Sequence, residues 1–85
     1  MPRLIPAAER LIMARALIQK AREVSPPADG GKYDFSYIAQ VKDLLRQARD
    51  LVKFIPQSAG ASAQVKAEAV SIIKETEQAD QEILH

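Results

Sequence analysis

Several residue types are scarce in this chain of 85 residues, and each absence excludes a kind of site. The chain has no cysteine, which excludes disulfides, thiolate metal sites and cysteine nucleophiles. Its one histidine is the last residue, His85, so neither a Ser/His/Asp triad nor a histidine-based metal site has an imidazole placed within the fold. The sequence therefore predicts a protein that is not an enzyme and has no catalytic residues, metal ion or cofactor.

Long apolar runs are missing as well. No run approaches the roughly 20 residues that a membrane-spanning helix needs. Near the N-terminus, Glu9, Arg10 and Arg15 interrupt the apolar residues too often for a secretory signal. Together with the absence of cysteine, which fits a reducing compartment, this predicts a cytoplasmic protein with no transmembrane segment.

The net charge is small. Twelve basic and eleven acidic side chains leave +1, which is not the charge of a protein that holds nucleic acid by neutralising phosphates. The two signs are unevenly spread, however. Residues 1–56 carry ten basic and six acidic side chains, a balance of +4, whereas residues 57–85 carry two and five, a balance of −3. We therefore expect no specific nucleic-acid partner, and an acidic C-terminal segment that lies beside basic residues.

Helical periodicity is clearest between Tyr37 and Ile55. Apolar residues recur there at alternating steps of four and three, at Tyr37, Val41, Leu44, Ala48, Leu51 and Ile55. Ile38, Leu45 and Val52 broaden this line on one side. At about 100° per residue, all nine positions fall on one wide face of a helix. A face of this width can contact two neighbours, which predicts the central helix of a bundle.

Two further segments repeat this heptad-like spacing. We call such a line of core-facing positions the seam of its helix. The seam of the first helix consists of Leu4, Ala7, Leu11, Ala14, Ile18 and Ala21, and that of the third helix of Val65, Ala69, Ile72, Thr76, Ala79 and Ile83. Prolines at 6, 26, 27 and 56 mark the boundaries. The pattern predicts helices at about 6–24, 35–55 and 60–82, with fraying after Asp80. Asp34 is the expected N-cap of the second helix, and Ser58 or Ser62 that of the third.

Short connections favour antiparallel neighbours, so the chain should go up, down and up. We therefore predict an all-α, antiparallel three-helix bundle, formed as a single domain over residues 5–84. Reading the second seam in reverse gives six layers that each mix large and small side chains, for example Ala14, Leu44 and Thr76. In this register the acidic end of the third helix lies beside Lys20 and Arg22.

The succession of three helices resembles MIT domains, BAG domains and the N-terminal bundles of some SNARE proteins. The MIT pattern of the second helix is matched at Gly31-Lys32-Tyr33, whereas Ser36 and Gln40 stand where Ala and Tyr are expected. The segment VKAEAVSIIKE resembles the last helix of BAG domains. These likenesses imply an MIT-like or BAG-like architecture, and no binding residue of either family carries over to this chain.

Apolar residues outside the seams give the best indication of function. On the first helix, Ile5, Ala8, Ile12 and Ala16 form a second line nearly opposite the seam, with Met13 at its edge. Phe54 and Val70 lie outside the apolar arcs of the second and third helices. These positions predict a non-catalytic protein-interaction or assembly module that binds a partner helix or self-associates as a homodimer. The expected contact residues are Ile5, Ile12, Met13, Ala16, Phe54 and Val70.

The second helix also carries a row of basic residues on its polar side. This basic ridge consists of Lys42, Arg46, Arg49 and Lys53. As an alternative function, it predicts weak binding of an anionic surface, such as acidic lipid, RNA or an acidic peptide. Asp43 and Asp50 offset the ridge, and each is expected to pair with Arg46.

Overall fold

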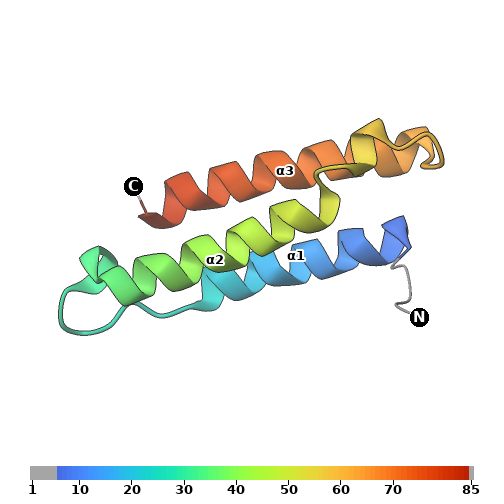
Figure 1. Cartoon of the computed structure of the whole chain (residues 1–85). Helices are drawn as coiled ribbons and strands as arrows, with labels where there is room; N and C mark the ends of the chain where they lie inside the picture. Colours follow the sequence, from blue (N-terminus) through green and yellow to red (C-terminus); the bar gives the residue numbers. More distant parts are fainter. Residues whose placement is uncertain (1–5, 85) are drawn as a thin grey trace.

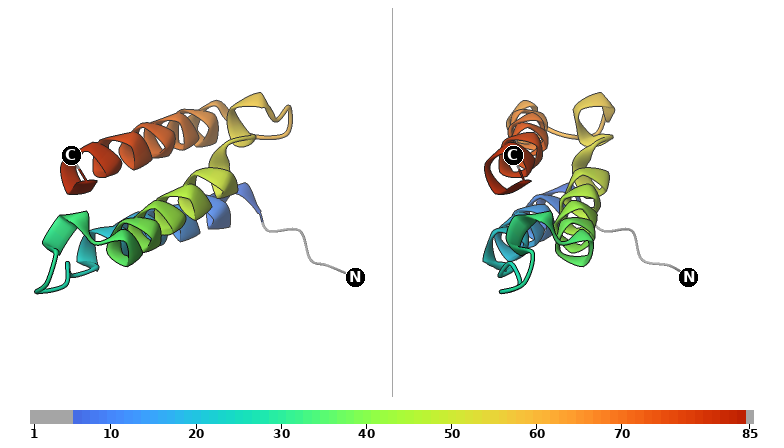
Figure 2. Two further views of the ribbon diagram at one scale, coloured as in Figure 1. Left: turned by 60° about the vertical axis from the view of Figure 1, so that its left-hand side comes forward. Right: turned by 90° about the vertical axis from the view of Figure 1, so that its left-hand side faces the viewer.

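The computed structural model describes residues 6–84, which form three α-helices and two short 3-10 turns. The elements are α1 (Ala7–Glu23), η1 (Gly31–Tyr33), α2 (Phe35–Val52), η2 (Ile55–Gln57) and α3 (Ala63–Leu84). The helices run up, down and up (Figure 1), and each contacts the other two. Viewed close to the helix axes, α3 lies over the pair α1 and α2 (Figure 2). The predicted all-α three-helix bundle is confirmed.

Side-chain caps define the N-termini of α2 and α3. The Asp34 carboxylate accepts a hydrogen bond of 2.9 Å from the backbone N–H of Tyr37, as the sequence predicts. At α3 the cap is Ser62, whose Oγ accepts from the Val65 N–H at 3.2 Å. This settles the choice between Ser58 and Ser62. It also explains why α3 begins at Ala63 and not at residue 60.

The C-termini of α2 and α3 lie on opposite sides of their predicted approximate positions. The helix α2 ends at Val52, three residues before the predicted position, because Pro56 has no N–H to donate to the Val52 carbonyl four residues earlier and its ring clashes with that carbonyl. Ile55 then lies in η2 and remains buried. In contrast, α3 continues to Leu84, two residues past its predicted end. Ile83 and Leu84 pack half-buried against the core at this end, where Asp80 and Glu82 also pair with Lys42 and Arg22.

The core is formed by the three predicted seams. Leu4 lies outside the described residues, and every other seam position is buried or half-buried. The large side chains with the least exposure are Val41, Val52 and Ile72. Thr76 is the one polar residue buried among the described positions, and its hydroxyl donates to the Ile73 carbonyl at 2.7 Å. Its burial therefore leaves no unsatisfied donor.

Contacts between helices agree with the predicted register. Arg22 of α1 pairs with Glu82 of α3 at 2.7 Å, and Lys42 of α2 pairs with Asp80 at 3.4 Å. Arg10 donates a hydrogen bond of 3.3 Å from its Nη1 to the Leu51 carbonyl. These contacts lie at or beside the layers in which the seams place Ala21 with Ile83, Val41 with Ala79, and Leu51 with Ala7. No helix of the described region has the length and hydropathy of a membrane span.

Candidate interaction surfaces

The outer side of α1 exposes apolar side chains. Because Leu11, Ala14, Ile18 and Ala21 face the core, the residues between them on the helical wheel face solvent. Ile12 is 69% exposed, and Met13 and Ala16 are also exposed. Ile5 lies outside the described residues. We call Ile12, Met13 and Ala16 the α1 surface, and it corresponds to the first contact surface that the sequence predicts.

A groove between α1 and α2 continues the α1 surface. It has a volume of about 650 Å³ and is lined by Met13, Ala16, Leu17, Lys20, Gln47, Asp50 and Leu51. Leu17 and Leu51 are half-buried, so their exposed parts add apolar area beside Met13. Lys20 and Asp50 provide one charge of each sign. The structure thus joins two predicted contact residues, Met13 and Ala16, to three α2 side chains that were not predicted as contact residues, Gln47, Asp50 and Leu51.

Phe54 and Val70 belong to other parts of the bundle. Phe54 follows the end of α2 and is 68% exposed, with the Lys53 ammonium nitrogen 5.1 Å from its ring centroid. At this distance the pair makes a cation–π contact that covers part of the ring. Val70 is exposed on α3. Neither residue lines the α1–α2 groove, so the structure does not join them to the α1 surface.

Sequence analysis missed the most exposed aromatic residue. Phe35, the first residue of α2, is 88% exposed, and Tyr33 just before it is also exposed. The signal was present, since Phe35 falls outside the apolar arc of its helix at 100° per residue. Both lie at the turn between α1 and α2, beyond the end of the α1–α2 groove.

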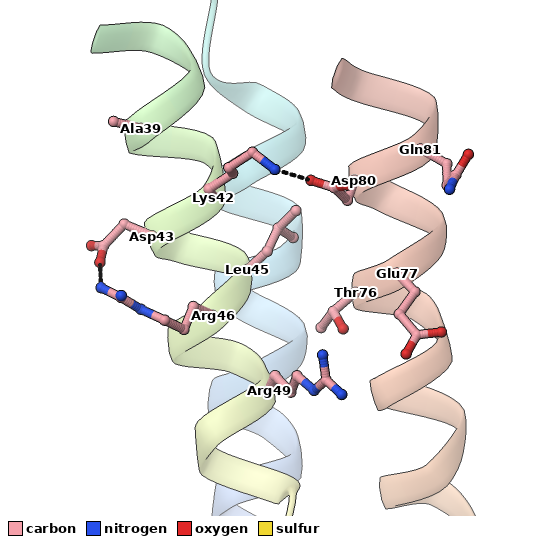
Figure 3. Close-up of a pocket in the computed structure, with 10 residues that line it drawn as sticks. All are labelled: Ala39, Lys42, Asp43, Leu45, Arg46, Arg49, Thr76, Glu77, Asp80 and Gln81. Atoms are coloured by element: carbon pink, nitrogen blue, oxygen red, sulfur yellow. Dashed lines mark hydrogen bonds and ion pairs between the residues drawn. The ribbon is translucent and has the colours of Figure 1, made fainter. Parts of the chain in front are cut away.

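A second groove separates α2 from α3 and is mainly charged. Its volume is about 960 Å³, and its lining residues are Ala39, Lys42, Asp43, Leu45, Arg46, Arg49, Thr76, Glu77, Asp80 and Gln81 (Figure 3). Leu45 and Thr76 are buried and form the floor. Three members of the basic ridge therefore line the α2 side, opposite the carboxylates of Glu77 and Asp80 on α3.

Ion pairs neutralise most of the basic ridge. Lys42 pairs with Asp80, Arg46 with Asp43 at 2.7 Å, and Lys53 with Asp50 at 3.2 Å. The predicted Asp43–Arg46 pair is confirmed, whereas Asp50 was wrongly assigned to Arg46. Arg46 also lies one turn from Asp50, but its guanidinium is paired with Asp43, and Asp50 pairs with Lys53 one turn further along the chain. Among residues 6–84, Arg49 is the ridge residue without an ion pair.

The side of α3 that faces α1 is acidic. The hydrogen bond from Arg22 lowers the pKa of Glu82 below its ordinary value; desolvation opposes this shift, and the Arg22 charge and Gln78 add to it. Glu75 is half-buried and its Oε2 has no hydrogen-bond partner in the described structure. Within residues 6–84, no group of three His, Cys, Asp or Glu side chains is placed to hold a metal ion.

No protein-family model, curated protein or solved structure matches this chain. The likeness to MIT and BAG domains therefore stays a prediction about architecture. Any functional conclusion depends on the two grooves and the exposed apolar residues themselves.

Proposed function

We propose that this protein is a non-catalytic interaction module that binds a partner helix along the α1 surface and the adjoining α1–α2 groove. The observation that carries the proposal is the exposed apolar row Ile12, Met13 and Ala16, two members of which, Met13 and Ala16, also line a groove with Leu17 and Leu51. Single exposed apolar residues are common in proteins. A row of them next to an apolar groove is the form that helix-in-groove recognition takes.

The groove suggests how a partner helix would bind. One large apolar side chain of the partner fits over Leu17 and Leu51, and its neighbours one turn away contact Ile12 and Ala16. Lys20 and Asp50 border the groove, so they favour a partner with complementary charges at its edges. The partner helix belongs either to another protein or to a second copy of this chain.

An affinity experiment with matched variants tests the proposal. The wild-type chain, Ile12→Asp and Ser71→Asp are immobilised and exposed to extract from the source organism. Both substituted residues are exposed, so each variant should keep its stability within about 0.5 kcal/mol. We expect a protein that the wild type and Ser71→Asp retain and Ile12→Asp loses. Equal retention by all three chains would contradict binding through the α1 surface, and sedimentation of the purified chains separates a second copy from another protein.

A second candidate is weak binding of an anionic surface through Lys42, Arg46, Arg49 and Lys53. It is supported by the alignment of these four side chains on one exposed side of α2, with Arg49 lacking an ion pair among the described residues. Binding to anionic vesicles or RNA should then disappear on reversing the charges of Arg46 and Arg49, and should fade with salt. Binding that survives both changes would exclude this role.

A further inference from the structure

The two walls of the α2–α3 groove carry opposite charges. The α2 wall is lined by Lys42, Arg46 and Arg49 together with Asp43, and so remains basic overall, whereas the α3 wall presents Glu77 and Asp80. In Figure 3 Arg49 extends from α2 toward α3, and Glu77 lies on the opposite wall. The Lys42–Asp80 pair spans the groove toward one end. Within residues 6–84, neither Arg49 nor Glu77 has an ion pair across the remaining opening.

A face with one positive and one negative edge is self-complementary under one kind of two-fold symmetry. When two copies meet face to face about an axis parallel to the helices, the positive edge of each copy meets the negative edge of the other. If the two-fold axis lies in the plane of the interface but perpendicular to the helices, each edge meets the edge of the same charge on the other copy. Closed two-fold dimers use the same patch on both subunits, so this face satisfies their basic requirement.

We propose that two copies of this chain associate through their α2–α3 faces, with Arg46 and Arg49 of each copy against Glu77 of the other. The groove of about 960 Å³ gives the other copy's side chains room to enter, and Leu45 and Thr76 form its floor. Val70 lies two helical turns before Glu77 on the same side of α3 and adds an exposed apolar contact. The net charge of +1 leaves little long-range repulsion between copies.

The charges set the direction of association more than its strength. Because the paired groups are exposed, their contacts are screened by salt and contribute little each. The dimer should therefore be weak and should loosen as salt increases. The dimer uses a different face from the α1 surface, so Ile12→Asp should leave dimerisation unchanged. If the chain does not dimerise, the proposed binding of a partner helix is not affected.

Complementary charge reversals test this pairing. In the first variant, Arg46→Glu and Arg49→Glu make both walls acidic; in the second, Glu77→Lys and Gln81→Lys make both walls predominantly basic. All four residues are exposed, so the fold should tolerate the changes. We expect sedimentation velocity at low salt to show a concentration-dependent dimer for the wild type. Each variant alone should have a dissociation constant raised by about tenfold or more, and an equimolar mixture should form dimers again.

Matched controls distinguish the pairing from a general effect of charge. A mixture of Arg15→Glu with Glu23→Arg, both changed on exposed positions of α1, should behave as the wild type does. A single chain that carries all four groove substitutions should dimerise with itself. If a reversed chain fails to fold by circular dichroism, Arg46→Gln with Arg49→Gln should still weaken the dimer. A wild type that stays monomeric at the highest concentration, or dimers that both reversals leave intact, would overturn the proposal.

Discussion

The helix α2 borders two grooves of different character. The α1–α2 groove is lined by Met13, Leu17 and Leu51, whereas the α2–α3 groove is lined by Arg46, Arg49 and Glu77. The difference follows from the position of the apolar arc on α2. Leu51 ends the arc on the α1 side with part of its surface exposed, while Leu45, near the other end of the arc, is buried. Charged residues follow Leu45 around the helix at once.

This comparison separates two physical roles. In the proposed binding of a partner helix, apolar area in the α1–α2 groove would supply the affinity, at about 25 cal/mol per Å² of surface removed from water. Exposed charges in the α2–α3 groove contribute little energy, yet they decide which orientations are allowed. The helix α2 thus contributes to two grooves. The α1–α2 groove is suited to binding strength, and the α2–α3 groove to selecting the orientation of a partner.

The largest expected effect comes from the core beneath both grooves. Leu44→Ala should lower the free energy of unfolding by about 2–5 kcal/mol, because it leaves a cavity in the central layer between Ala14 and Thr76. Urea denaturation measures this loss. Leu51→Ala is the matched comparison, and it should cost less since Leu51 is only half-buried. An unchanged midpoint for Leu44→Ala would contradict the register of the three seams.

The ion pair across the charged groove should matter much less. Lys42→Ala removes the 3.4 Å pair with Asp80, and we expect a loss of about 0–1 kcal/mol that disappears at high salt. Lys74→Ala is a suitable control, because Lys74 is exposed and has no ion pair among the described residues. A loss for Lys42→Ala as large as that for Leu44→Ala would mean that charge, and not apolar packing, holds α3 against α2.

The smallest effect concerns Glu82. Its pKa lies below the ordinary glutamate value because of the hydrogen bond from Arg22. A lowered pKa in the folded state stabilises the fold at pH above the ordinary value, and this contribution is lost as the pH falls through the lowered pKa. An NMR titration should show the Glu82 carboxyl titrating below ordinary glutamates. Arg22→Gln should raise the pKa of Glu82. An unshifted Glu82 titration in the wild type would contradict the hydrogen bond between Arg22 and Glu82.

The fold was largely predictable because its information is local. The alternation of four and three fixes which side of each helix is buried, and Asp34 marks the start of α2 through its side-chain chemistry. The end of α2 was missed because the helix was extended up to Pro56, although a proline excludes the hydrogen bond to the carbonyl four residues earlier, that of Val52. The last turns of α3 contact the core through Ile83 and Leu84 and pair with Arg22 and Lys42, which come from distant parts of the sequence, so the local pattern of α3 could not predict where it ends.

The surfaces were predictable only as lists of exposed residues. Exposure of Ile12, Met13 and Phe54 follows from helical position alone. The grooves do not, because they depend on how far apart two helices lie and on which ion pairs form between them. The sequence places Arg49 on the polar side of α2. Only the three-dimensional arrangement of the helices shows that Arg49 lies opposite Glu77 across a groove.

The most direct test of two separate surfaces is an NMR series in which the concentration of the wild-type chain is raised at low salt. We expect concentration-dependent chemical-shift changes at Arg46, Arg49 and Glu77, with the signals of Ile12 and Met13 unchanged. Shifts confined to Ile12 and Met13 would contradict the assignment, because they would make the apolar surface of α1 the site where copies associate.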